Sequence, residues 1–325
     1  MKRFPPPYNK NEIDLLIPYA ITGNGVLLED HLGGFDANLT NCLLDTLNNQ
    51  IEKLAISSPV NFFHHQILDD AVKANYPALN IKFDFRQTNR KLWQPFKKYN
   101  QHPDLDYKNF ICSFNGSPHV SRKLLAAILQ RFGYYNTEYC SKNFVFSKDK
   151  LDGHIADYVS DQDNFYRKFF IANNSDVFFN TINSFGHVQF NHRQNIYNLE
   201  SKLTESFLHI VSETMATSYC PFVTEKFLYS IVTRGLFLAY AQPGWHDHVE
   251  KYYGFKRYTK LFDYRFDAIQ NPVERLIELM SMISKFSMLS ITDWTDLYLL
   301  EQETIEYNYN HFFSGDYLKL LKLYE

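Results

Sequence analysis

The residues best suited to chemistry in this sequence follow one apolar run and open the next helix-like segment. Residues 207–212 are apolar enough for a buried strand, and the pair Ser212-Glu213 stands at its end. After a gap, the triplet Thr224-Glu225-Lys226 stands where a helix should begin. Nucleotides bind in open α/β sheets where the carboxyl end of a parallel strand faces a helix N-terminus. The block therefore has the residue types and the place expected of a nucleotide site.

Two side chains of this block can each bind a different part of a nucleotide. Glu225 can accept hydrogen bonds from two ribose hydroxyls, and Lys226 can meet a phosphate. The same pattern is also typical of an ordinary helix start, in which Thr224 caps the helix and the helix dipole favours an acid in the first turn. On composition alone, the ordinary helix start is the favoured interpretation.

Two series of alternating strands and helices are expected to position this block. The first series consists of a strand at 13–19, a glycine-bearing loop at 23–36, a helix at 36–54, a strand at 60–63, a helix at 68–75 and a strand at 79–85. The segment Arg90–Tyr107 contains Pro95 and Pro103 and predicts a connector between domains. Strands that alternate with helices predict a parallel α/β sheet.

The second series contains the block itself. Its expected elements are strands at 109–114, 207–212 and 236–240, helices at 120–133, 224–234, 249–253 and 272–287, and a helical tail at 293–325. Gly133 and Gly235 stand where helices should end, because glycine adopts the left-handed conformation of a helix C-terminus. Residues 1–12 predict an extended arm, because the prolines at 5–7 cannot continue a helix.

Composition limits the class of protein. The 325 residues are 45% hydrophobic and 21% charged, which excludes wholesale disorder and leaves room for about two domains. The formal net charge of −3 argues against a generally cationic nucleic-acid binder but leaves a local basic face open. We find no apolar run typical of a signal peptide or transmembrane helix, so we expect a cytoplasmic protein without a membrane partner. The cysteines have neither zinc nor disulfide spacing and predict reduced thiols.

The features that follow Thr224-Glu225-Lys226 resemble those of a known enzyme family. They are an apolar helix, Gly235, a strand, Pro243-Gly244, the run Tyr253-Gly254-Phe255-Lys256, the aspartate-rich stretch 262–267 and the run 271–276. With the strand before them, they cover about residues 207–287 and resemble the C-terminal half of GT-B glycosyltransferases. The likeness is to the α-1,3-fucosyltransferase type and, more closely, to glycosyltransferases of bacteriophage genomes. It implies an α/β fold of two Rossmann-like domains facing a cleft.

The resemblance also implies a nucleotide-sugar site. In the family, a basic residue after the first strand of the donor domain meets the pyrophosphate; Arg122 is the best match, with Lys123 in reserve. A solvated basic helix face formed by Arg122, Lys123 and Arg131 is an equally good interpretation. The expected donor-binding residues are Asn115, Gly116, Arg122, Lys123, Ser212, Glu213, Thr224, Glu225 and Lys226. The family's Glu-Asn pair is Glu213-Thr214 here and the gap at 215–220 is unusual, so the donor sugar stays open.

Metal and general-base chemistry have weaker signals. Asp161-Gln162-Asp163 lies in a polar stretch away from the expected site, and the resemblance implies that protein cations rather than a metal stabilise the diphosphate. An inverting enzyme needs a general base on the acceptor side, whereas a retaining enzyme does not. The loop at 23–36 offers Asp30, His31 and Asp36. Asp30 is the preferred base, and the alternative is a solvated loop carboxylate.

These expectations combine into a two-domain enzyme. Residues 1–104 would hold the acceptor, residues 105–290 a nucleotide sugar, UDP-linked in preference to GDP-linked, and residues 291–325 would pack back across the cleft. The resemblance to phage enzymes implies 5-hydroxymethylcytosine in phage DNA as the acceptor. Basic pairs such as Arg90-Lys91 and Lys97-Lys98, interleaved with aromatic residues, could hold the DNA backbone and stack bases. The alternatives are a glycan or lipid-linked saccharide acceptor, and a nucleotide-sugar-binding module without catalysis. The oligomeric state stays open.

Overall fold

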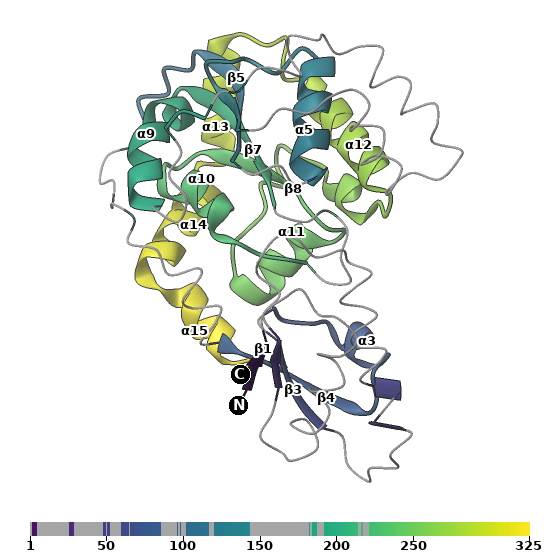
Figure 1. Ribbon diagram of the computed structural model, residues 1–325. Helices are drawn as coiled ribbons and strands as arrows, with labels where there is room; N and C mark the ends of the chain where they lie inside the picture. Colours follow the sequence, from purple (N-terminus) through teal and green to yellow (C-terminus); the bar gives the residue numbers. More distant parts are fainter. Residues whose placement is uncertain are drawn as a thin grey trace.

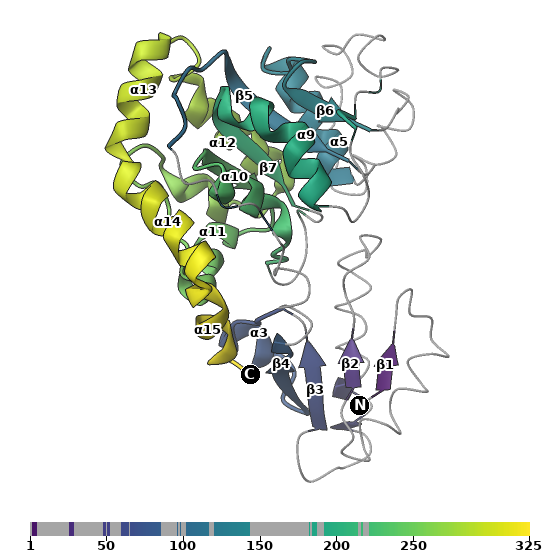
Figure 2. The same cartoon turned by 90° about the vertical axis from the view of Figure 1, so that its left-hand side faces the viewer.

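Two parallel four-stranded sheets form the frame of the described chain (Figure 1, Figure 2). The computed structural model describes residues 60–64, 66–85, 102–116, 120–143, 192–213 and 221–325, with shorter pieces at 2–4, 26–28, 48–49, 51–52, 96, 98, 182, 184–186 and 216. In order across the first sheet lie β1 (Lys2–Phe4), β2 (Val26–Leu28), β3 (Val60–His64) and β4 (Leu79–Phe83). In order across the second lie β6 (Cys140–Lys142), β5 (Asn109–Asn115), β7 (Ser206–Ser212) and β8 (Leu236–Tyr240). Neighbouring strands are parallel in both sheets, which confirms the expected α/β class.

Helices connect and cover the strands. Around the sheets lie α3 (Asp70–Lys73), α5 (Val120–Arg131), α9 (His192–Thr204), η2 (Glu225–Phe227), α10 (Leu228–Val232), α11 (Trp245–His248), η3 (Val249–Tyr253), η4 (Tyr264–Ala268) and α12 (Pro272–Ser284). The chain ends with α13 (Ile291–Leu300), α14 (Gln302–Ser314) and α15 (Asp316–Lys322). Figure 1 shows α5 and α12 on one side of the second sheet and α9, α10 and α14 on the other.

Strands β7 and β8 are buried along their whole length. Helices on both faces of a parallel sheet exclude water from both, so such strands are apolar at successive positions rather than at alternate ones. This is why both strands can be recognised in the sequence. At the start of β7, Phe207 stacks on Trp294 with ring centroids 5.6 Å apart, which joins α13 to the sheet.

His209 is the ionisable residue in β7, and both of its ring nitrogens have partners. Nε2 donates to the Leu203 carbonyl at 2.8 Å, so Nδ1 accepts from the Ser230 hydroxyl at 2.9 Å. Burial lowers the pKa of His209 to about 4. Gly235 lies directly beside this ring, because a Cβ at that position would be 2.1 Å from His209 Cε1.

The expected helix at 224–234 is divided, and Gly235 does not end it. The 3-10 turn η2 precedes α10, and the left-handed backbone position after α10 is Arg234, with φ of 54°. Glycine is required at 235 for its contact with His209 rather than for its backbone conformation. At the end of α5, by contrast, Gly133 has φ of 75°, as expected for a helix terminus.

The last helices run from the second sheet toward the first. Figure 2 shows α13, α14 and α15 following one another down the side of the molecule, and Tyr324 packs edge-on against Tyr252 of η3 at 5.0 Å. Part of the expected connector packs against these helices, since Phe96 contacts Phe312 of α14 at 5.8 Å. The helices α13, α14 and α15 thus confirm the expectation of a helical tail at 293–325.

Candidate functional site

Glu213 organises the block that the sequence singles out. It follows β7 at the carboxyl end of the second sheet, and it is 0% exposed. Its Oε1 accepts a hydrogen bond from the Thr224 backbone N–H at 3.1 Å, and its Oε2 accepts one from the Thr224 hydroxyl at 2.6 Å. Both carboxylate oxygens thus accept hydrogen bonds from Thr224, the residue that caps η2. Glu213 therefore holds the start of η2 in place.

Lys226 completes this cluster from within η2. Its Nζ lies 2.8 Å from Thr224 Oγ1 and 3.5 Å from Glu213 Oε2. Burial lowers the pKa of Lys226, and the negative charges of Glu213 and Glu225 oppose that shift. The lysine side chain remains 21% exposed, so its ammonium group can meet a ligand while it pairs with Glu213.

Arg122 is a buried charge whose Nε has no hydrogen-bond partner within the described chain. It stands in the first turn of α5 and is 5% exposed. Burial lowers its pKa to about 10, and the charges of Glu213 and Glu225 act in the opposite direction, so the group stays cationic at neutral pH. A buried guanidinium is costly unless an anion engages its donors. The position is therefore suited to a bound anion.

Helix α5 and the end of β7 are joined directly, which brings Arg122 to the same edge as Glu213. The Ser121 hydroxyl donates to the Glu213 carbonyl oxygen at 3.4 Å, and the Ser212 hydroxyl donates to the same oxygen at 3.3 Å. Arg122 and Lys123 are 5% and 8% exposed, so the interpretation as a solvated basic face is wrong.

The end of β5 contributes further polar groups to this edge. Asn115 is 0% exposed; its backbone N–H donates to Ser141 Oγ at 3.1 Å and its Nδ2 to Ser113 Oγ at 3.2 Å. Its Oδ1 has no partner among the residues that the structure describes, and Gly116 beside it is half-buried. Lys142, which the sequence did not single out, ends β6 next to Asn115, and burial lowers its pKa to about 8.

Two glutamines that the sequence also missed hold the segment that leads into Thr224. The Phe222 backbone N–H donates to Gln242 Oε1 at 3.0 Å, and the Val223 N–H donates to Gln66 Oε1 at 3.1 Å. With the bond to Thr224, three successive backbone N–H groups are each held by a buried side chain. Gln66 follows β3, so the first sheet contributes directly to the site.

Several predicted residues cannot be placed. Asp30, His31 and Asp36 lie outside the described residues, as do Asp161-Gln162-Asp163 and Thr214. Over the described ranges, no group of three or more His, Cys, Asp or Glu side chains could hold a metal ion. The structure thus brings together the predicted donor-side residues and leaves the predicted base unlocated.

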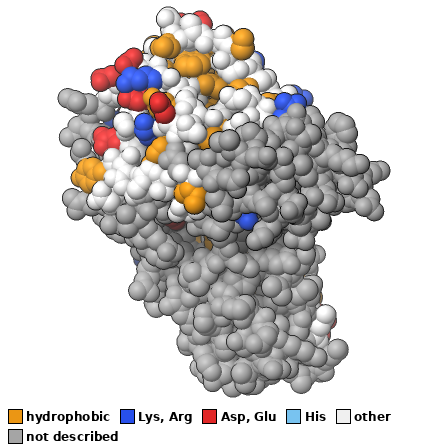
Figure 3. All heavy atoms as spheres, turned by 45° about the horizontal axis from the view of Figure 1, so that its top comes forward, with side chains coloured by type: hydrophobic (Ala, Val, Ile, Leu, Met, Phe, Trp, Pro, Cys, Tyr) orange, Lys and Arg blue, Asp and Glu red, His pale blue; other side chains and the backbone are white. Residues whose placement is uncertain are grey.

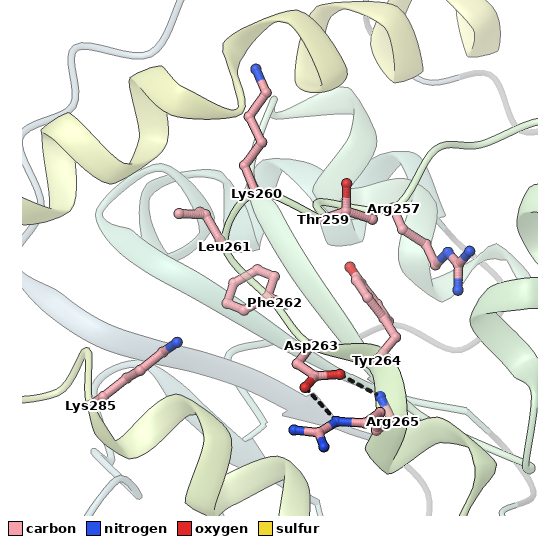
Figure 4. A pocket seen from close by; sticks show the side chains of 9 residues that line it. All are labelled: Arg257, Thr259, Lys260, Leu261, Phe262, Asp263, Tyr264, Arg265 and Lys285. Atoms are coloured by element: carbon pink, nitrogen blue, oxygen red, sulfur yellow. Dashed lines mark hydrogen bonds and ion pairs between the residues drawn. The ribbon is translucent and has the colours of Figure 1, made fainter.

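A surface pocket of about 630 Å³ shares no residue with this cluster (Figure 4). It is lined by Arg257, Thr259, Lys260, Leu261, Phe262, Asp263, Tyr264, Arg265 and Lys285. Two of its cations already have carboxylate partners, because Arg265 Nε lies 2.6 Å from Asp263 and Arg257 Nε lies 2.7 Å from Glu250. Surface ion pairs of this kind are common and contribute little. The buried guanidinium of Arg122, whose Nε has no hydrogen-bond partner among the described residues, therefore marks the candidate site better than the pocket does.

None of the helices in the described part of the chain is both long and apolar enough to cross a membrane. Comparison with known proteins gives no match: no family model fits the chain, and neither a curated protein nor a solved structure is significantly similar to it. Its function must therefore be inferred from the residues of the site and from the sequence resemblance.

Proposed function

We propose that this protein is a glycosyltransferase that uses a nucleotide sugar, with a UDP-linked donor favoured over a GDP-linked one. One observation carries the proposal: the buried Arg122 guanidinium, whose Nε has no hydrogen-bond partner within the described chain, stands at the same sheet edge as the Glu213–Thr224–Lys226 cluster. A helix N-terminus and a buried guanidinium together favour a phosphate group. The order of sequence features after Thr224 supplies the class of enzyme.

In this proposal each donor-side residue has a distinct role. Arg122 and Lys226 bind the diphosphate and stabilise the negative charge that grows on it as the glycosidic bond to the sugar breaks. Glu225 accepts hydrogen bonds from the ribose hydroxyls. Glu213 and Thr224 contact the donor little, because their polar atoms already bind each other, and they hold η2 in place. Protein cations rather than a metal neutralise the leaving group.

The proposed architecture is that of two Rossmann-like domains facing a cleft. The two separate parallel sheets support it, since one is built from residues before 84 and the other from residues 109–240. In this scheme residues 1–104 hold the acceptor and residues 105–290 the donor, while residues 291–325 pack back across the cleft. Asp30 is the proposed general base, with His31 and Asp36 as alternatives; Asp30→Asn should lower turnover and spare donor binding.

For the acceptor we propose 5-hydroxymethylcytosine in DNA, with a glycan or lipid-linked saccharide as the alternative. Figure 3 shows basic and acidic side chains intermixed on the described part of one face. The basic residues at 90–99 with Trp93 and Tyr99 are the proposed contact, whereas Phe96 is buried against Tyr229 and Phe312 and is not part of it. A nucleotide-sugar-binding module without catalysis is the third possibility, and it would retain the donor without hydrolysing or transferring it.

Calorimetric titration with UDP and GDP tests the donor site. We expect UDP to bind, and Arg122→Met to weaken binding at least about tenfold, because the charge-assisted hydrogen bonds to phosphate are lost. Arg131→Met, in the last turn of the same helix, is the matched control and should leave affinity unchanged. Absence of binding by both nucleotides would overturn the proposal. Incubation of UDP-sugars with hydroxymethylcytosine DNA or with oligosaccharides then separates the two acceptors.

A further inference from the structure

Gln66 makes a paired contact with the main chain of Val223, 157 residues away in the sequence. Gln66 Oε1 accepts from the Val223 N–H at 3.1 Å, and Gln66 Nε2 donates to the Val223 carbonyl at 3.4 Å. Gln66 is 2% exposed, so water competes little for these bonds. The amide thus satisfies both polar groups of one residue in the loop that leads to the candidate site.

The peptide unit between Val223 and Thr224 is held from both sides. Its carbonyl oxygen accepts from Gln66 Nε2, and its N–H donates to Glu213 Oε1 at 3.1 Å. Because a peptide unit is planar, two hydrogen bonds at its opposite edges fix its orientation. That orientation aims the Thr224 hydroxyl at Glu213 and sets the start of η2, which carries Glu225 and Lys226.

We propose that Gln66 is a positioning residue through which the first sheet orders the anion site of the second. The identity of the anion as a nucleotide diphosphate rests on the proposed function. Gln66 itself has no place at the ligand, since its amide is occupied by Val223. Affinity for the donor therefore depends on a residue outside the domain that binds it.

A second contact between the two sheets provides a control. Asp69 accepts from the Tyr252 hydroxyl at 2.5 Å and lies 3.1 Å from Lys251 Nζ. These bonds join the same loop after β3 to η3 but do not touch the segment at 222–226. Asp69→Ala therefore weakens the docking of the loop without removing a bond to Val223.

The test compares Gln66→Met with Asp69→Ala in the full chain. Methionine has about the size of glutamine and removes both hydrogen bonds to Val223, together with the weaker one that Gln66 Oε1 accepts from the Tyr253 hydroxyl at 3.5 Å. Hydrogen exchange of peptides covering residues 221–227 should become about tenfold faster in Gln66→Met, and UDP affinity should fall by a similar factor, because one buried hydrogen-bond pair is lost. Asp69→Ala should change both quantities less than twofold.

Two results would overturn the inference: unchanged exchange at 221–227 in Gln66→Met, or an equal effect of Asp69→Ala on that segment. If the wild-type protein binds neither UDP nor GDP, the proposed function fails, and the exchange rates alone still decide whether Gln66 orders the segment. If Gln66→Met does not fold, Gln66→Glu replaces it. Glutamate keeps the acceptor for the Val223 N–H but sets a carboxylate against the Val223 carbonyl, so faster exchange is again expected and unchanged exchange contradicts the inference.

Discussion

Glu213 and Thr224 are joined by two hydrogen bonds, one to the backbone N–H and one to the hydroxyl of Thr224. A fully buried carboxylate would be costly by itself, and these bonds together with Lys226 offset that cost. The pair ties the end of β7 to the start of η2. Two segments separated by the gap at 214–220 thus act as one support for the site.

Removal of the Glu213 charge should weaken this support. In Glu213→Gln one oxygen remains to accept a hydrogen bond, while the new amide group cannot accept from Thr224 and Lys226 loses its counter-charge. We expect the free energy of unfolding to fall by about 1–3 kcal/mol. Urea denaturation measures it, with Glu278→Gln on the exposed face of α12 as the control. Equal stability of the two variants would contradict a supporting role for Glu213.

Glu225 is predicted to bind the donor without supporting the fold. It is half-buried in the first turn of η2, so Glu225→Ala should abolish UDP binding and leave the unfolding midpoint nearly unchanged. Calorimetry checks the first outcome and thermal unfolding the second. Glu274→Ala, which removes an exposed first-turn acid from α12, is the matched control and should bind UDP normally. Unchanged affinity in Glu225→Ala would remove this residue from the site.

Gly235→Ala should be strongly destabilising. The added methyl group would lie 2.1 Å from His209 Cε1, and the ring cannot move without losing its bonds to Leu203 and Ser230. We expect a loss of about 1–3 kcal/mol or more, as for overpacking of a core. Gly133→Ala serves as the comparison, because its Cβ would meet nothing within 4 Å and only its φ of 75° is strained. A smaller loss at 235 than at 133, measured by thermal unfolding, would argue against this packing.

The protein should lose stability as the pH falls below about 6.5, the usual histidine pKa. Burial lowers the folded-state pKa of His209 to about 4, so between these values the unfolded chain binds a proton that the folded chain does not. The neutral ring therefore contributes its full stability above pH 6.5 and loses it progressively toward pH 4. Urea denaturation from pH 7.5 to 4.5 measures the trend. Titration of the His209 ring by NMR with a midpoint near 6.5 would contradict it.

The regular elements of the second sheet were predictable because their patterns are local. Strands β5, β7 and β8 are apolar runs, and α5 and α12 show apolar residues at helical spacing. Strand β6 was missed, since its three residues carry no pattern and pair with β5 only through the backbone. Helix α9 was missed as well, because its sequence is polar and only a few positions, such as Ile196 and Leu199, are buried.

The candidate site likewise contains residues that the sequence could single out and residues that it could not. Glu213, Thr224, Glu225 and Lys226 could be singled out because they stand where a strand ends and a helix begins, and that position follows from local periodicity alone. Gln66 and Gln242 gave no such signal, since a glutamine that binds a distant backbone resembles any polar residue of a loop.

The sequence by itself determined the alternation of strands and helices in the second sheet, and with it the parallel α/β class and the chemical types at the strand ends. In the first sheet it missed β1 and β2, which lie in the expected arm and the expected loop, and the expected strand at 13–19 lies outside the described residues. Only the tertiary structure decided that Arg122 is buried, that its Nε lacks a partner within the described chain and that it lies at the same edge as Glu213. The reason is physical. Periodicity is set by neighbours along the chain, whereas burial and hydrogen-bond pairing depend on segments that only the folded topology brings together.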